Sequence, residues 1–413
     1  ATAPVPAGDP APTYPERVGN PFPLREGSLG DGRASAIVAV PKGPVDALLE
    51  GLFTWGVLYP DGRVRTLPDL GSNAVLSPDG RRVLTVPAEG YPPATKIPDD
   101  GSTASSVRDT AFARFVVLDL ADGVSREVPV PAPADSAIVV TADLAHGFWS
   151  PDSSRVANKV CVSDTAPAVW DRCTEPLRVA VFGPGLTPAL LTLDGELVGW
   201  HDTTTLVTVS PPPAEIETTE PVKVDLVDSA SGEVKRSLSF TLPYRDQAGP
   251  AEMNSVPRVV GGDASVSPTG RTLGVRMDNR DWDGPQWVFS VDLATGAVSE
   301  AGEVPNKGDM GSRELLWRGD EPLVGLSDRV VSAADPNGRP LVAIHPMTDL
   351  RPTSWVANAF SGPATSSALG TQAPWPFWFW KESLVVAALI AAWVLLYVCV
   401  RRRRRPEPNR VSR

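Results

Sequence analysis

Three stretches of the chain share one pattern: AVLSPDGRRVLTV at residues 74–86, GFWSPDSSRVANKV at 147–160 and SVSPTGRTLGVRM at 265–277. Each places apolar residues before a Ser-Pro pair, a Gly or Ser turn after it, and a second apolar run after the turn. Short runs separated by turn residues are typical of β-hairpins. Because this hairpin recurs, the sequence predicts an all-β fold built from repeats.

A second hairpin pattern alternates with the first. It occurs as FVVLDLADGVSREV at 115–128, VDLVDSASGEVKR at 224–236 and VFSVDLATGAVSE at 288–300. The Asp-Gly, Ser-Gly and Thr-Gly steps suit the positive φ angles of tight hairpin turns. We expect the first pattern to form the inner hairpin of each repeat and the second the outer hairpin. Repetition indicates a structural role for Asp119, Asp228 and Asp292, which would cap the turn backbone.

The spacing of the inner hairpins sets the size of the repeat. They begin near residues 77, 150 and 267, with looser versions near Trp200 and Trp317. The longer gaps contain insertions, so the base period is about 40–50 residues, the size of a four-stranded propeller blade. The sequence predicts a six-bladed β-propeller over residues 34–357, with five or seven blades as alternatives. Strands in 34–68 would join strands before residue 357 to complete the sixth blade and remove free edges.

These hairpins also carry a family resemblance. The S-P-D-G hairpins followed by V-D-L-x-T-G hairpins resemble those of TolB-type and WD-repeat-like β-propellers across residues 34–357. The preference for Arg over Lys and the richness in Ala, Pro and Val resemble actinobacterial proteins, among them uncharacterised membrane-anchored propellers. The resemblance implies an architecture and no particular activity.

The C-terminal region predicts a membrane anchor. Residues 384–400 form an unbroken apolar run of 17 residues, which spans about 25 Å as a helix. Trp375, Trp378 and Trp380 precede it and suit a headgroup interface, and Arg401, Arg402, Arg403, Arg404 and Arg405 follow it. Because arginines stay on the cytoplasmic side, we expect an aromatic belt and single-pass transmembrane helix at 375–400, a cytoplasmic tail at 401–413 and the propeller outside the cytoplasm.

The remaining segments and the charge fit this topology. Residues 1–33 predict an extended Pro-rich lead-in, and the small polar residues 358–374 predict a flexible stalk. The ATAPVPA start resembles the mature end left by signal-peptide cleavage. The tail contributes +6 to a net charge of −11, which leaves −17 for the rest of the chain. Such acidity disfavours nucleic acid and anionic membrane surfaces as partners of the ectodomain.

Cys161 and Cys173 flank a Pro-containing loop between two strand-like runs. In an exported domain this spacing predicts a disulfide across a hairpin, with two free thiols as the alternative. A zinc site is disfavoured because no nearby His completes the ligand set. We expect Cys399 to be a lipid-facing apolar residue.

The segment DNRDWDG at 278–284 carries the most site-like local motif. Asn279, Asp281 and Asp283 offer spaced oxygen ligands for calcium. Ser290 stands where a calcium loop has its bidentate Glu, so an acidic, solvated loop is the alternative. No other metal or cofactor is predicted.

No catalytic residue emerges from the sequence. A G-x-S-x-G nucleophile motif is absent from it, and His146, His201 and His345 are too few for a copper or haem site. Carboxylates are plentiful, but nothing singles out one pair as an acid and base. Trp149, Trp200 and Trp317 begin inner hairpins, where packing between blades is favoured over a sugar-stacking platform.

We therefore expect a membrane-anchored extracytoplasmic propeller that binds or scaffolds a protein or envelope ligand, at or near the same membrane, and that is not an enzyme. The alternatives are an envelope-directed hydrolase or lyase with a funnel site, and a sensor subunit of a membrane complex. The residues that line the funnel distinguish them. Converging carboxylates or a metal would favour an enzyme, whereas an apolar lining would favour binding.

Overall fold

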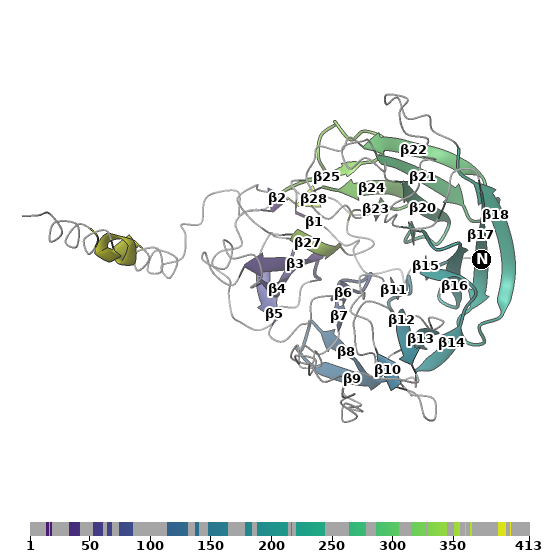
Figure 1. Ribbon diagram of the computed structural model, residues 1–413, viewed down its shortest axis with the longest axis horizontal. Helices are drawn as coiled ribbons and strands as arrows, with labels where there is room; N and C mark the ends of the chain where they lie inside the picture. Colours follow the sequence, from purple (N-terminus) through teal and green to yellow (C-terminus); the bar gives the residue numbers. More distant parts are fainter. Residues whose placement is uncertain are drawn as a thin grey trace, which may run out of the picture.

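The computed structural model describes much of the predicted propeller and a short part of the C-terminal region. The described residues are 14–15, 17–18, 33–41, 53–60, 64–67, 74–85, 114–130, 137–139, 148–163, 178–183, 188–213, 216, 220–243, 264–277, 286–304, 315–326, 329–344, 351–355, 360, 364–365, 387–393 and 397. Most of them belong to six β-sheets that lie around a central axis (Figure 1). The prediction of a six-bladed β-propeller is confirmed.

In the first three blades the four strands lie in chain order from the axis outward, except that the inner strand of blade 1 comes from the C-terminal end of the propeller. Blade 1 contains, from the axis outward, β27 (Arg351–Trp355), β3 (Ala36–Pro41), β4 (Phe53–Leu58) and β5 (Val64–Leu67). Blade 2 contains β6 (Val75–Leu76), β7 (Arg82–Thr85), β8 (Arg114–Asp119) and β9 (Ser125–Pro129). Blade 3 contains β11 (Phe148–Trp149), β12 (Val156–Ser163), β13 (Arg178–Phe182) and β14 (Ala189–Thr192), and β10 (Ala137–Val139) pairs with the far end of β12.

The other three blades have the same plan. Blade 4 contains β15 (Glu196–Trp200), β16 (Thr205–Ser210), β17 (Pro221–Asp228) and β18 (Val234–Thr241). Blade 5 contains β19 (Ala264–Val266), β20 (Thr272–Met277), β21 (Gln286–Asp292) and β22 (Val298–Val304). Blade 6 contains β23 (Leu315–Arg318), β24 (Glu321–Gly325), β25 (Arg329–Ser332) and β26 (Val342–Ile344).

The apolar runs of the sequence form the middle strands of the blades. In blade 4, five of the six residues of β16 are buried, whereas most of the outer strand β18 is exposed. Neighbouring blades cover both faces of a middle strand, so its residues are apolar without strict alternation. The outer strand has solvent on one side and carries charged residues such as Lys235 and Arg236.

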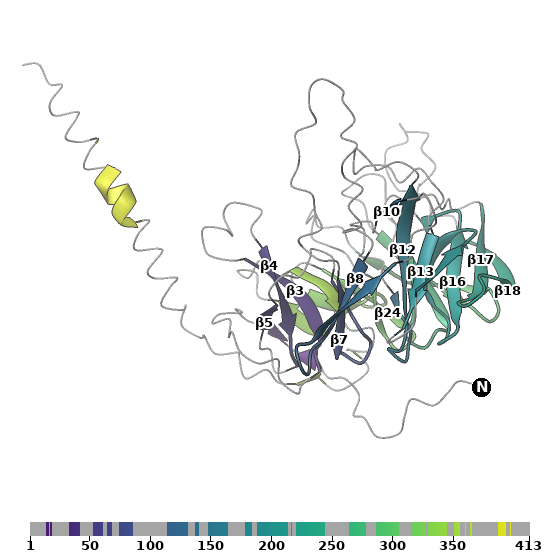
Figure 2. The same cartoon turned by 90° about the horizontal axis from the view of Figure 1, so that it is seen from below.

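The antiparallel blades give the ring two different faces. Figure 2 shows β3, β7, β12 and β16, the second strands of four blades, running between the same two faces. On the turn face lie the turns that join the first strand to the second in blades 2 to 6, as at residues 77–80, and the turns that join the third strand to the fourth, as at residues 119–123. On the opposite, connection face the chain passes from the second strand to the third and from one blade to the next. The described strand ends next to the predicted insertions lie there, at Thr85 and Arg114 in blade 2 and at Ala264 in blade 5.

The ring is closed by strands from opposite ends of the propeller. β27 pairs antiparallel with β3, with Trp355 opposite Ala36 and Arg351 opposite Ala39. The pairing expected between strands in 34–68 and a strand before residue 357 is therefore present.

The two ends of the chain also meet outside blade 1. β2 (Arg17–Val18) pairs parallel with β26, and β1 (Tyr14–Pro15) pairs parallel with β28 (Ala364–Thr365). The rings of Tyr14 and Phe360 lie 5.1 Å apart and are 6% and 2% exposed. We call β1, β2, Phe360 and β28 the terminal clasp.

The terminal clasp shows that parts of the two flanking segments pack against the propeller. The sequence predicts a lead-in at 1–33 and a flexible stalk at 358–374, but the clasp residues within them are paired or buried. Tyr14 and Phe360 belong to the apolar cluster that includes Ile37 of blade 1, Leu76 of blade 2 and Leu316 of blade 6. The rest of both segments lies outside the described residues.

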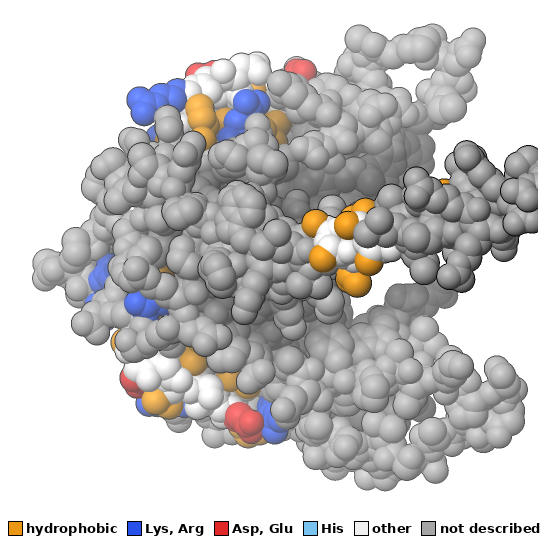
Figure 3. All heavy atoms as spheres, turned by 90° about the vertical axis from the view of Figure 1, so that its left-hand side faces the viewer, with side chains coloured by type: hydrophobic (Ala, Val, Ile, Leu, Met, Phe, Trp, Pro, Cys, Tyr) orange, Lys and Arg blue, Asp and Glu red, His pale blue; other side chains and the backbone are white. Residues whose placement is uncertain are grey.

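The predicted membrane segment is described only in part. Residues 387–393 and 397 are helical. Leu389, Ile390, Trp393 and Tyr397 are exposed, with Trp393 67% accessible, and Figure 3 shows the apolar side chains of this helix in orange. Within the part of the chain that the structure describes, no helix is long and apolar enough to cross a membrane. The full span at 375–400 and Arg401–Arg405 lie mostly or wholly outside that part, so the transmembrane helix stays a prediction.

We predict that Phe360→Ala lowers the free energy of unfolding by about 3 kcal/mol, because it removes a buried ring and leaves a cavity. Val124→Ala, at a side chain that is 47% exposed in an outer turn, is expected to change it by less than about 0.5 kcal/mol. Denaturant unfolding of both variants measures the difference. Equal small effects would show that the clasp does not dock on the propeller.

Candidate functional site

The inner turns on the turn face owe their shape to a buried serine. Ser77, Ser150 and Ser267 are almost wholly buried. Their Oγ atoms accept hydrogen bonds from the backbone N–H groups five residues later, at 2.9 Å from Arg82, 2.9 Å from Arg155 and 3.1 Å from Thr272. The Ser of the Ser-Pro motif therefore closes the inner turn from inside.

The third residue after that serine lies against the preceding blade. Gly80 has φ +68°, and its carbonyl accepts a hydrogen bond of 2.8 Å from Ala34 N of blade 1. A Cβ there would lie 2.4 Å from the Ala34 carbonyl oxygen, so glycine is required. Blade 3 has Ser153 at this position with φ 60°, and its hydroxyl accepts a bond of 3.0 Å from Asp79 N of blade 2. That bond offsets the strain of a left-handed non-glycine residue.

Further hydrogen bonds connect the turns of the next blades. Arg155 donates from Nη1 to Ser229 Oγ of blade 4 at 3.2 Å. His201 Nδ1 lies 2.5 Å from the Gly270 carbonyl oxygen of blade 5 and donates to it. Ser267 Oγ donates to Asp320 Oδ1 of blade 6 at 2.7 Å. Blades 1 to 6 are thus joined in sequence along the turn face.

The three tryptophans pack between blades, as the sequence indicates. The indole Nε1 atoms of Trp149, Trp200 and Trp317 donate to inner strands of the preceding blades, at 3.3 Å to Val75 O, 2.9 Å to Phe148 O and 2.9 Å to Ser265 Oγ. All three side chains are buried. These bonds fix each inner strand to its neighbour.

Inner strands and inner turns of four blades line an open axial pocket of about 130 Å³. It is lined by Val75, Leu76, Pro78, Phe148, Trp149, Pro151, Gly199, Trp200, Val266, Ser267 and Pro268. Blades 2, 3, 4 and 5 contribute, and none of the described residues that line the pocket is charged. The axial pocket therefore suits an apolar group.

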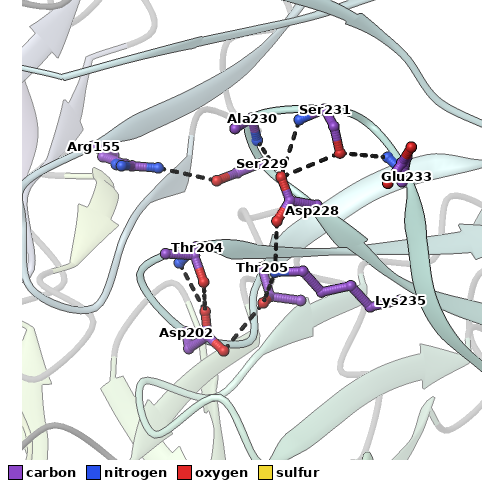
Figure 4. A network of polar contacts seen from close by, with 10 residues as sticks. All are labelled: Arg155, Asp202, Thr204, Thr205, Asp228, Ser229, Ala230, Ser231, Glu233 and Lys235. Carbon is purple, nitrogen blue, oxygen red and sulfur yellow. Dashed lines mark hydrogen bonds and ion pairs between the residues drawn. The ribbon is translucent and has the colours of Figure 1, made fainter.

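Blade 4 has a network of charged and polar residues on the turn face, apart from the pocket lining, and Figure 4 shows it. Lys235 Nζ lies 2.8 Å from Asp228 Oδ2 and 3.2 Å from Thr205 Oγ1. Asp202 accepts bonds from Thr204 N at 2.7 Å and Thr205 Oγ1 at 3.1 Å. These groups hold the turns of one blade together.

The same contacts keep both carboxylates ionised. The hydrogen bond from Lys235, followed by those from the backbone of Ala230 and Ser231, lowers the pKa of Asp228 far below its usual range. Burial alone would raise the pKa of Asp202, but hydrogen bonds from Thr204 and Thr205 outweigh it and lower that pKa. A carboxylate held in this state is a poor general acid near neutral pH.

The recurring aspartates cap the outer turns, as predicted. Oδ1 of Asp119, Asp228 and Asp292 accepts a bond of 2.9 Å from the backbone N–H two residues later, at Ala121, Ala230 and Ala294. In Asp292, bonds from the hydroxyl and backbone of Thr295 lower the pKa of the carboxyl. The three aspartates recur because each one caps the outer turn of its blade.

Several predicted sites fall outside the described residues. These are the calcium loop with Asn279, Asp281 and Asp283, the histidines His146 and His345, and Cys173. Cys161 lies on β12 opposite Val139, but its side chain is not among those described, so the disulfide stays a prediction. Among the described residues, no group of three or more His, Cys, Asp or Glu side chains is arranged to hold a metal.

The axial pocket itself was not predicted from the sequence. One available signal was the proline that follows the serine in each inner turn, since Pro78, Pro151 and Pro268 all reach the pocket. A partly buried ion pair between blades 3 and 4, Lys159 with Glu196, was also missed. Nothing in the local sequence places these two residues together.

No family model matches the chain, and no curated protein matches it. Similar solved structures include TolB from Acinetobacter baumannii, at 14% identity and a TM-score of 0.40, covering 78% of this chain and 66% of that one. A putative TolB from Agrobacterium tumefaciens has 13% identity and a TM-score of 0.24, over 67% and 91%. An oligogalacturonate lyase in complex with manganese has 10% identity and a TM-score of 0.39, over 67% and 65%.

TolB-type β-propellers are thus among the solved structures similar to this chain. The chain spans slightly less than two thirds of the Acinetobacter TolB and of the lyase. At these identities the likeness concerns the fold alone.

A pH prediction comes from Asp152 in the inner turn of blade 3. Burial alone would raise its pKa, but bonds from Ser150 Oγ at 2.6 Å and Ser154 N at 3.0 Å outweigh it and lower the pKa. A lowered folded-state pKa stabilises the protein above the unfolded value of about 3.9, and this contribution is lost as pH falls through the folded value. We expect stability to drop between pH 5 and pH 3 (roughly the window of carboxylate titration), and to drop less in Asp152→Asn. Denaturant unfolding across this range measures both slopes, and parallel slopes would contradict the assignment.

Proposed function

We propose that this protein is a membrane-anchored extracytoplasmic binding or scaffold module whose axial pocket receives an apolar part of its partner. The observation that carries the proposal is the lining of the pocket, whose described residues come from four blades and carry no charge. Ligand pockets are mostly apolar, with few polar groups.

The electrostatics of the turn face favour binding over hydrolysis. Asp202 and Asp228 already accept hydrogen bonds from within blade 4, and neither belongs to the pocket lining. A glycosidase-like mechanism needs one carboxyl with a raised pKa and a second carboxylate across the reacting bond. The described carboxyl groups whose pKa is perturbed are shifted downward, which disfavours the acid role.

The membrane anchor is the second part of the proposal. It rests on the apolar run at 384–400, the aromatic residues before it and Arg401–Arg405 after it. The exposure of Leu389, Ile390 and Trp393 on a helix is consistent with contact with lipid. In this arrangement the propeller stands outside the cytoplasm and meets partners at or near the same membrane.

The anchor predicts a clear fractionation result. The full chain is expected to remain in the membrane pellet after an alkaline wash, whereas a chain lacking 375–413 is released. Protease added to intact cells is expected to digest the propeller and to spare an epitope placed after Arg413. Release of the full chain by the wash, or protection of the propeller, would contradict the proposed topology.

A charge placed at the pocket tests the binding role. Pro268→Glu puts a carboxylate at the pocket, where its desolvation is expected to weaken partner capture roughly tenfold, or about 1.4 kcal/mol. Pro221→Glu makes the same change at an exposed position on the connection face and is the matched control. Circular dichroism first checks that both variants fold. The amount of partner captured by each anchored variant is then measured by quantitative cross-linking. Equal capture by both variants would reject the axial pocket as the binding site.

A further inference from the structure

We propose that the axial pocket binds one uncharged monocyclic ring of about the size of benzene. This inference rests on the proposed function, since it names the ligand class of the same pocket. Among ligand groups, it ranks an uncharged ring ahead of sugars, carboxylates and ammonium groups as the part that enters.

The side-chain polar groups of the pocket are already occupied. Trp149 and Trp200 use their indole N–H groups to reach backbone carbonyls of neighbouring blades. Ser267 donates to Asp320 and accepts from Thr272 N. A ligand with hydroxyl or charged groups would lose its bonds to water without replacing them through these side chains, which costs free energy for each unpaired group.

The prolines remove further donors from the pocket. Pro78, Pro151 and Pro268 occupy the same position in three inner turns and lack a backbone N–H. They present ring methylene groups instead. The repeated Ser-Pro motif therefore has two roles: its serine closes the turn, and its proline places ring carbons in the wall of the pocket.

The volume matches a small ring. The pocket holds about 130 Å³, and an engineered apolar cavity of about 150 Å³ in another protein binds benzene. We therefore expect the part of the ligand that lies inside the pocket to be a single ring.

The pocket is rigid before a ligand arrives. Its walls belong to inner strands and turns that hydrogen bonds join to neighbouring blades, through Trp200, His201 and Ser267. A preformed site avoids the cost of ordering side chains on binding, so a small apolar ligand can bind measurably without polar contacts.

Fluorobenzene is a direct probe of this pocket. The full chain in lipid nanodiscs is titrated by ¹⁹F NMR, with empty nanodiscs as the blank for partition into lipid. We expect saturable binding at one site. Val266→Phe and Val75→Phe fill the pocket from opposite blades, and each is expected to weaken binding by at least about tenfold. Val234→Phe, on the exposed outer strand of blade 4, is the control and should bind as the parent does.

Two related probes test the ligand class. Fluorobenzoate and fluoroglucose are expected to bind at least about tenfold more weakly than fluorobenzene. The inference is overturned if fluorobenzene does not saturate, if both filled variants bind it as the parent does while folded, or if fluorobenzoate binds as well as fluorobenzene.

Partner capture separates this inference from the proposed function and locates the source of the ring. If partner capture depends on the pocket but fluorobenzene does not bind, the inference about the ligand class is wrong and the proposed function stands. If capture does not depend on the pocket and fluorobenzene does not bind, both proposals are wrong. If saturating fluorobenzene releases a captured partner, the partner's side chain supplies the ring. If fluorobenzene binds and the partner stays, the ring belongs to a free small molecule.

Discussion

The pairing of β27 with β3 is the constraint on which the rest of the molecule depends. Blade 1 takes its inner strand from the far end of the chain. Without that strand β3 would lose its inner partner, and blades 2 and 6 would pack against an incomplete blade 1. Closure brings blade 6 and blade 1 together, so that Leu316 and Ile37 belong to one apolar cluster. The axial pocket can therefore be narrow and rigid although two-residue strands such as β6 and β11 form part of its wall.

The polar residues of the turn face serve mainly to hold the backbone. Ser77 and its counterparts close inner turns, and Asp119, Asp228 and Asp292 cap outer turns. Since these side chains are engaged within or between blades, the axis is left to Val, Phe, Trp and Pro. The same repeats thus produce both the stability of the ring and the apolar character of its centre.

Local repetition explains which features were predictable. The inner hairpins, the aspartate caps and the packing of Trp149, Trp200 and Trp317 each follow from a motif of a few residues, and closure follows from the count of hairpins. The axial pocket depends on how four blades converge, which no single motif encodes. Lys159 and Glu196 meet across two blades for the same reason. The terminal clasp joins strands of two residues, which are too short to show any periodicity.

The terminal clasp has a mechanical consequence. Any tension applied to the chain beyond Thr365 reaches the short β1–β28 pairing first, and only afterwards the longer β27–β3 pairing that closes the ring. The clasp can therefore separate under a load at which the closed propeller stays intact. Its separation would expose the aromatic rings of Tyr14 and Phe360, and it would lengthen the chain segment between the propeller and the point where the C-terminal end is held.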